Sequence, residues 1–169
     1  MKEFLKRKNI EISAKRYGID ALGAMAQGLF CTLLVGTILN TLGQQLNIGF
    51  LKATIAAGYT IGGLASAMVG PGIAVAIGFA LNAPSLVLFS LIPVGFAANS
   101  MGGAGGPLAV YFVAILACEL GKLVSKETKV DILVTPTVTV LTGVGFAALV
   151  AAPIGHAANA VGQAIMWAT

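Results

Sequence analysis

The sequence predicts an all-α membrane protein, a polytopic bundle of transmembrane helices. Between Asp20 and Glu119 the only charged side chain is Lys52. Over the 169 residues, 57% are hydrophobic and 9% are charged, whereas soluble domains carry about 25% charged residues. Several apolar stretches reach the length of about 20 residues that a helix needs to cross the hydrocarbon core. They lack the alternation of barrel strands, so helices are expected to make the crossings.

Residues 1–19 form a basic segment before the expected transmembrane domain, 20–169. Six of its side chains are Lys or Arg, interleaved with apolar residues such as Phe4 and Ile10. The segment is either an amphipathic helix on the membrane surface or a solvated tail. The apolar stretch 21–39 is longer than that of a signal peptide, and Gln44-Gln45-Leu46-Asn47 follows it instead of a cleavage site. It is therefore expected to be a retained first span.

Further apolar stretches bring the expected number of crossings to about five. One span each is predicted for 53–69, 108–123 and 132–152. The stretch 71–98 is too long for a straight span and is interrupted at Asn82-Ala83-Pro84. It either crosses once as a discontinuous helix or enters and leaves on one side. Residues 156–167 are too short to span and would form a half-helix, a re-entrant piece or the start of a further element.

The distribution of Lys and Arg predicts the orientation. Nine of the ten lie in two places, six before residue 17 and three at Lys122, Lys126 and Lys129. Because Lys and Arg gather in cytoplasmic loops, both clusters and the N-terminus are expected to face the cytoplasm. An even number of crossings must then separate them. This favours one discontinuous crossing for 71–98.

Glycine and proline pairs mark expected helix breaks. Pro71, Pro107 and, more loosely, Pro153 follow or precede glycine, and each is expected to open a helix. The break Asn82-Ala83-Pro84-Ser85 lies near the middle of its stretch, so it would place the Asn82 amide and the Ser85 hydroxyl at membrane depth. Unwound helices at the midplane bind solutes in many transporters. The alternative is a proline kink without a binding role.

Glu119 and Lys122 are charged groups at the end of one predicted span. A carboxylate inside a membrane is costly unless it is paired or near the surface. Lys122 follows three residues later, so both side chains lie on one helix face. They form either an interfacial ion pair or a site that couples transport to protons or solute.

Four more polar residues are candidates for contact with a solute. His156 is the only histidine, and Asn159 follows at helical spacing. An imidazole exchanges hydrogen bonds with a solute and titrates near neutral pH. Asn99 and Ser100 lie beside the glycine-rich turn 102–106. Each of these pairs either recognises a solute or is a polar surface exposed to water.

No arrangement typical of an enzyme is found in the sequence. We see no paired nucleophile and base, no phosphate-binding glycine-lysine loop and no metal-ligand spacing, so the expectation is a protein without catalytic activity, cofactor or metal. Basic residues are not interleaved with aromatic residues along a surface, which gives no support for nucleic-acid binding. The net charge of +4 is expected to favour anionic membrane lipids.

Two segments carry a more specific resemblance. The loop and helix start from Gly121 to Thr139, and the stretch from Lys15 to Met25, resemble a branch of the membrane permease (IIC) subunits of the bacterial phosphotransferase system that includes toxin-regulator-like proteins. The resemblance implies movement of a sugar or related polyol across the bacterial inner membrane, coupled to phosphorylation by cytoplasmic subunits. Members of the group are longer, so this chain would correspond to their N-terminal half.

The leading hypothesis is therefore a permease for a small polar solute such as a sugar, with a path lined by the candidates above. The competing hypothesis is a membrane sensor or regulator, which binds a ligand and signals through its cytoplasmic loop without moving the ligand. About five crossings are few to enclose a site. A homo-oligomer or a complex with a missing second half is therefore expected.

Overall fold

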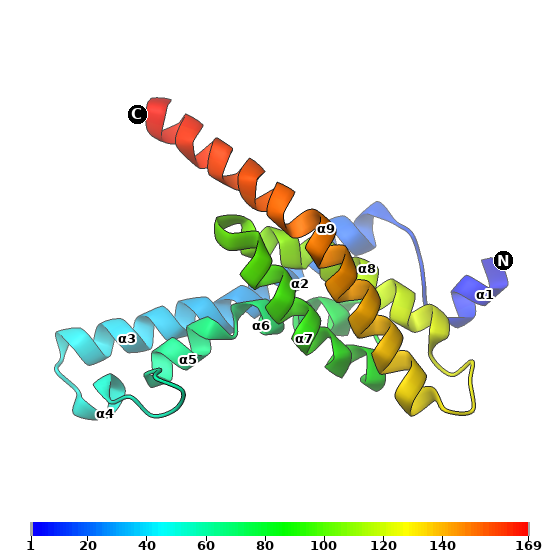
Figure 1. The fold of residues 1–169 in the computed structure, drawn as a ribbon, viewed down its shortest axis with the longest axis horizontal. Coiled ribbons are helices and arrows are strands. Elements are labelled where there is room, and N and C mark those ends of the chain that lie inside the picture. Colours follow the sequence, from blue (N-terminus) through cyan, green and yellow to red (C-terminus); the bar gives the residue numbers. More distant parts are fainter. Residues whose placement is uncertain (1, 169) are drawn as a thin grey trace.

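The structure, a computed structural model, describes residues 2–168, and all regular elements among them are helical (Figure 1). This confirms the all-α fold class. The elements in chain order are α1 (Lys2–Arg7), the π-helical segment η1 (Arg16–Asp20), α2 (Ala21–Leu29), a second π-helical segment η2 (Phe30–Leu34), α3 (Val35–Gln45), α4 (Gly49–Lys52), α5 (Ile61–Ala67), α6 (Val69–Ala80), α7 (Ser85–Gly102), the 3-10 turn η3 (Gly103–Gly105), α8 (Gly106–Val124) and α9 (Asp131–Ala168).

The first span is longer than the sequence predicted. Helix runs without interruption through η1, α2, η2 and α3, from Arg16 to Gln45. At 1.5 Å per residue, these 30 residues extend about 45 Å, more than the hydrocarbon core requires. The helix therefore begins inside the segment that was expected to precede the membrane domain.

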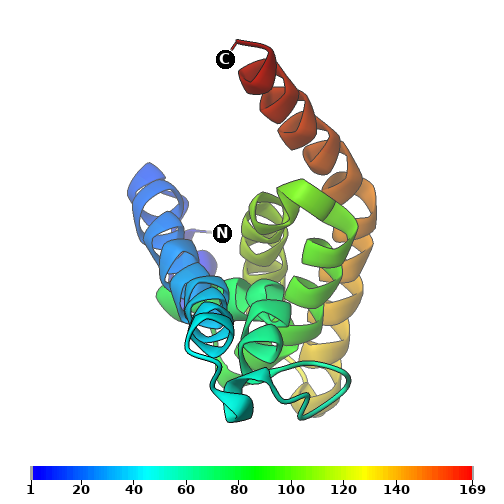
Figure 2. The same ribbon diagram turned by 90° about the vertical axis from the view of Figure 1, so that its left-hand side faces the viewer.

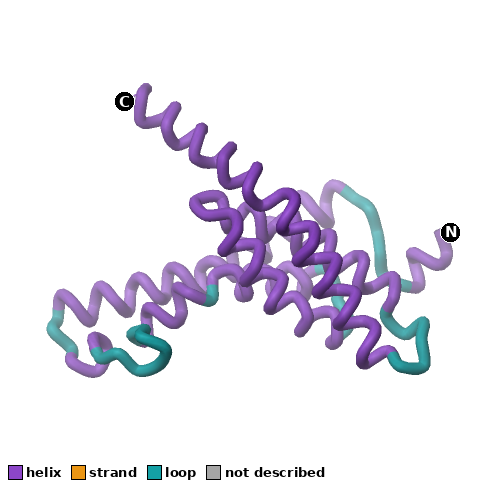
Figure 3. The backbone as a smooth tube through the Cα atoms, viewed as in Figure 1, coloured by secondary structure: helices purple, strands orange, loops and turns teal. Residues whose placement is uncertain are grey.

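The second span is formed by α5 and α6, which meet at a 55° bend. The prediction of a span over 53–69 was wrong in its first half, because 53–60 forms a loop (Figure 3). The two helices follow the first helix in the opposite direction. A Cβ on Gly28 would lie 2.7 Å from Ile73 Cα, and one on Gly36 would lie 2.5 Å from the Gly62 carbonyl oxygen. Glycine allows this close backbone approach, which is how helices associate in lipid.

The stretch 71–98 is an antiparallel hairpin of α6 and α7, so the prediction of one discontinuous crossing was wrong. A Cβ on Gly70, at the start of α6, would lie 2.2 Å from the carbonyl oxygen of Gly95, near the end of α7. The turn between the helices is a Schellman motif. Asn82 adopts a left-handed conformation (φ 55°), its N–H donates to Phe79 O at 3.0 Å, and the Ala83 N–H donates to Gly78 O at 2.9 Å.

A second hairpin joins α7 to α8. The apolar helical stretch from Ser85 to Val124 reverses at Gly103, which has a φ of 51°, and α7 and α8 pack side by side. Pro107 lies at the start of α8, as predicted, and Pro71 lies in the first turn of α6. Pro153 instead lies inside α9, so the third predicted helix start was wrong.

Helix α9 completes the bundle and then leaves it. Its first part packs against α7 and α8, and a Cβ on Gly143 would lie 2.7 Å from Val94 and 2.9 Å from Ala117. Residues 156–167 continue the same helix, and every residue from Asn159 to Trp167 is exposed. Figures 1 and 2 both show this end projecting from the bundle. Among the described residues, three helical stretches are long and apolar enough to cross a membrane, or four if the bent pair α5–α6 is one span. Counting α7 and α8 separately, as the two arms of their hairpin, gives five passes, which is roughly consistent with the predicted number.

Candidate functional site

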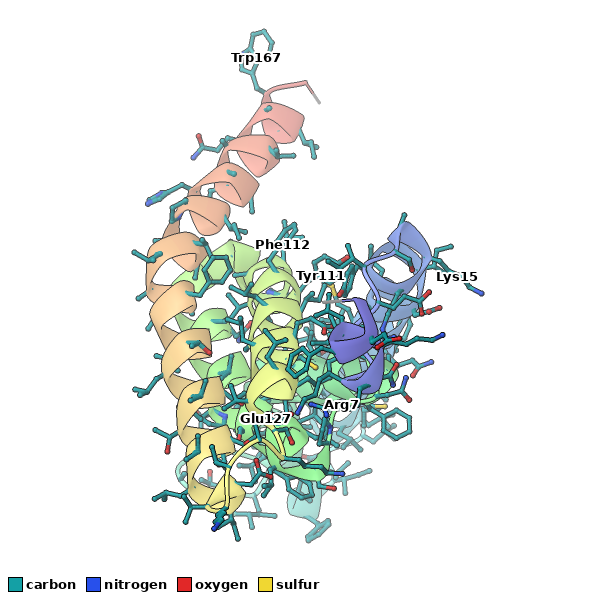
Figure 4. All side chains as sticks on the ribbon, turned by 90° about the vertical axis from the view of Figure 1, so that its right-hand side faces the viewer. Arg7, Lys15, Tyr111, Phe112, Glu127 and Trp167 are labelled. Atoms are coloured by element: carbon teal, nitrogen blue, oxygen red, sulfur yellow. The ribbon has the colours of Figure 1, made fainter. Side chains whose placement is uncertain are left out.

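Three segments that are distant in sequence meet at one end of the bundle, which we call the basic end. They are the N-terminal segment around Asn9 and Arg16, the turn at Leu81 and Asn82, and the end of α8 at Lys122. The even number of passes between Arg16 and Lys122 brings these two residues to the same end. The ion pairs Arg7–Glu127 and Glu119–Lys122 lie at this end, and Figure 4 labels Arg7 and Glu127 there.

Lys122 is a buried cation at the centre of the basic end. Only 1% of it is exposed, and its ammonium donates to the carbonyl oxygens of Asn9 at 3.0 Å and Leu81 at 3.1 Å. The carboxylate of Glu119, one turn earlier on α8, lies 2.9 Å from the ammonium. A buried charge persists only when it is paired and hydrogen-bonded, and these three acceptors meet that need.

Arg16 binds the same two residues from the start of the first helix. Its guanidinium donates to Leu81 O at 2.6 Å and to Asn9 Oδ1 at 3.1 Å. Leu81 is the C-cap of α6, where the last carbonyls lack helical partners and the helix dipole favours cations. The two cations therefore stabilise the end of α6 and tie three passes together.

Two tyrosines extend this contact between the first helix and α8. The Tyr111 hydroxyl of α8 donates to the Tyr17 carbonyl oxygen at 2.6 Å. Figure 4 shows Tyr111 on α8 facing the first helix. This hydrogen bond therefore ties α8 to the start of the first helix.

A pocket of about 390 Å³ opens beside these groups. Its lining residues are Arg7, Lys8, Asn9, Asn82, Pro84, Lys122, Ser125, Lys126 and Glu127. Arg7 and Lys8 reach across to the Glu127 carboxylate at 2.9 Å and 2.5 Å, and Figure 4 shows Arg7 and Glu127 facing each other. The hydrogen bond from Lys8, together with the charge of Arg7, lowers the pKa of Glu127. The carboxylate therefore stays ionised among the cations.

A family model described as "Phosphotransferase system, EIIC" matches residues 19–169. The chain belongs to the EIIC family of the phosphotransferase system. Members of this family are membrane permease components for sugar transport, and the apolar passes agree with a multi-pass protein of the inner membrane. Comparisons with curated proteins and with solved structures gave no match.

The sequence-predicted site residues of this EIIC protein fall at three places. Asn82 and Ser85 lie at the basic end, both exposed, and Asn82 lines the pocket. Asn99 and Ser100 lie at the opposite end of α7, where the Ser100 hydroxyl donates to Phe96 O at 2.8 Å.

The other predicted pair, His156 and Asn159, is exposed on the projecting part of α9. The fold of this one chain does not bring the three places together. A role for any of them in binding a solute stays a prediction. Asn82 has a structural role, because it is the left-handed residue of the turn between α6 and α7.

Sequence reasoning missed Asn9, Arg16, the Leu81 carbonyl and Ser125. A sequence signal could have found Arg16, because it is the last basic residue before the long apolar region. A cation at the start of a span lies near the ends of neighbouring helices. The backbone acceptors carried none. Among the described residues, no group of three His, Cys, Asp or Glu side chains is placed to hold a metal ion.

Proposed function

We propose that this EIIC protein forms the N-terminal part of a bacterial sugar permease whose basic end faces the cytoplasm. The observation that carries the proposal is the convergence of Arg16 and Lys122 on the Leu81 carbonyl. It places both basic segments at one end of the bundle. Because positive residues remain on the cytoplasmic side, the N-terminus and the 125–130 loop would lie inside the cell.

The solute path would be completed by chain that the described residues do not supply. Exposed apolar side chains line the projecting end of α9, where Val161 and Trp167 are 61% and 92% exposed. A second half or a second copy packed there would bury this surface and cover His156 and Asn159. Those two residues would then face the sugar from the outer side, with Asn99 and Ser100 near the same end.

At the cytoplasmic opening of the solute path, the inner mouth, Asn82 and Ser85 would contact the sugar as it leaves toward the phosphorylating subunits. The basic end suits the docking of such cytoplasmic partners, on which any phosphorylation would reside. Glu119 and Lys122 would hold the helices at this mouth. Their pairing supports a structural part in preference to one in coupling.

The test is sugar uptake by proteoliposomes that contain the chain alone or together with a C-terminal EIIC half. Uptake that needs both, and that falls in His156→Ala and Asn82→Gly variants of the assembled permease, is the expected result. The Asn82→Gly variant keeps the left-handed turn and removes only the amide. Saturable uptake that is unchanged in both variants would reject these residues as sugar contacts.

The same vesicles distinguish a permease from a sensor. A regulator would bind a cytoplasmic partner in a sugar-dependent manner and would move no sugar. The exposed residues 126–130 are the surface that such a partner would reach. Partner binding without flux in the complete assembly would replace the transport proposal by the regulatory one.

A further inference from the structure

The pocket at the basic end has more cationic groups than the fold uses. Arg7, Lys8, Lys122 and Lys126 line it, against the single carboxylate of Glu127. Lys122 is neutralised by Glu119, and Glu127 pairs with both Arg7 and Lys8. Among the described residues, the ammonium of Lys126 takes part in no ion pair. Positive charge therefore remains for a further anion.

Ser125 is an independent sign that the pocket has an occupant. This lining residue is only 3% exposed, and its hydroxyl has no hydrogen-bond partner within the part of the chain that the structure describes. Its carbonyl oxygen accepts from Lys8. Burying a hydroxyl without a partner is unfavourable, and a ligand oxygen in the pocket would satisfy it.

The Glu127 carboxylate shows where an anion is stable. It bridges Arg7 at 2.9 Å and Lys8 at 2.5 Å, so an acidic side chain of the loop occupies part of the cationic surface. The pocket, at about 390 Å³, is larger than one carboxylate needs. A tetrahedral anion with several acceptor oxygens suits donors that come from several directions.

We propose that this pocket binds a phosphate group, carried by a soluble phosphorylated solute or by the headgroup of an anionic phospholipid. Ser125 and Lys126 donate to its oxygens, and Arg7 and Lys8 exchange Glu127 for it. Three of the lining residues, Arg7, Lys8 and Asn9, precede residue 19, where the family match begins. Basic pockets at the ends of transmembrane helices are known to accept lipid headgroups.

The test measures binding to the purified full chain in neutral detergent, without sugar or gradient, so that its failure leaves the transport proposal intact. Inorganic phosphate and a hexose monophosphate are titrated in one arm. In the other arm the chain is reconstituted in phosphatidylcholine vesicles with or without phosphatidylglycerol, and its thermal stability is followed. Both arms use the same variants.

Ser125→Ala and Lys126→Gln are expected to weaken phosphate binding about tenfold, the effect of one hydrogen bond to a charged group. Glu127→Gln removes the internal competitor and is expected to strengthen binding several-fold. Lys129→Gln is the matched control, because Lys129 is an exposed lysine of the same loop that does not line the pocket. It should leave binding unchanged.

The two arms identify the source of the phosphate group. Residue-dependent binding of the soluble phosphates assigns the pocket to a phosphorylated solute. Stabilisation by phosphatidylglycerol alone, lost in Ser125→Ala and Lys126→Gln, assigns it to a lipid headgroup. The proposal is overturned if neither arm depends on Ser125 and Lys126, or if Lys129→Gln weakens binding as much as they do.

Discussion

Arg16 and Lys122 donate hydrogen bonds to one acceptor, the carbonyl oxygen of Leu81, at 2.6 Å and 3.1 Å. One cation begins the first pass and the other ends the fourth, while the acceptor ends the second. The arrangement offsets the partial negative charge at the end of α6. It also fixes the relative positions of three helices that otherwise meet mainly through small apolar side chains.

Replacement of Lys122 by methionine is expected to destabilise the protein by about 3–5 kcal/mol, because it leaves the Glu119 carboxylate buried without its cation. The unfolding free energy in detergent is the measurement. Lys129→Met, at an exposed position, should change it by less than about 0.5 kcal/mol. Equal effects of the two variants would show that the buried pair is not important for stability.

The Schellman turn predicts an unusual ranking of substitutions at Asn82. Glycine adopts a left-handed φ without strain, so Asn82→Gly should be nearly neutral. Asn82→Val should cost about 1–2 kcal/mol or more, since a β-branched residue is disfavoured there. Thermal unfolding of the two variants checks this. Equal stabilities of the two variants would contradict the left-handed conformation of Asn82.

Glycine contacts between helices predict position-specific effects of one methyl group. Gly70→Ala would place a Cβ 2.2 Å from the Gly95 carbonyl oxygen and should destabilise the α6–α7 hairpin by about 1–3 kcal/mol. Gly145→Ala is the control, because no atom lies within 4 Å of its added Cβ. The change in melting temperature should separate them, and similar values would contradict the hairpin contact.

The contact between α1 and the 125–130 loop is expected to depend on pH. The pKa of Glu127 is lowered in the folded protein, chiefly by the hydrogen bond from Lys8. The contact is therefore complete above the ordinary carboxylate pKa and is lost as the pH falls through the lowered value. Spin labels at Glu3 and Thr128 should separate only in acid.

In a Glu127→Gln variant the distance between the same labels should not change with pH, because the amide that replaces the Glu127 carboxylate does not titrate. A label distance that changes with pH in this variant would assign the transition to another group.

Orientation is tested by labelling from outside the cell. In a variant without the native cysteines, a membrane-impermeant maleimide should modify Ala57→Cys in intact cells and should reach Thr128→Cys only after lysis. The two positions lie in exposed loops at opposite ends of the described passes. Labelling of Thr128→Cys in intact cells would invert the proposed topology.

The passes could be predicted from the sequence because charge and hydropathy follow the membrane directly. The scarcity of charge between Asp20 and Glu119 predicts the membrane class, and the two basic clusters predict an even number of passes between them. Boundaries were harder to place. Composition stays apolar through the loop 53–60 and through the turn at Asn82, so no local signal separates helix from connection.

What decides these boundaries is contact between distant residues. The hairpin of α6 and α7 depends on Gly70 meeting Gly95, and the pocket depends on Asn9 reaching the end of α8. Sequence patterns describe each helix by itself, whereas such meetings depend on how helices pack. Glu119 and Lys122 were predicted to pair because they lie three residues apart on one helix.

The two π-helical segments, η1 and η2, set the rotational phase of the first helix. A π turn holds more residues than an α turn, and each residue of an α-helix advances the side-chain direction by about 100°. The phase reached after Phe30–Leu34 is the one that directs Gly36 at Gly62 while Gly28 still faces Gly72. In a regular α-helix the eight steps from Gly28 to Gly36 would turn the side-chain direction by about 80° beyond two full turns, so without the π turn only one of these glycines would face its partner.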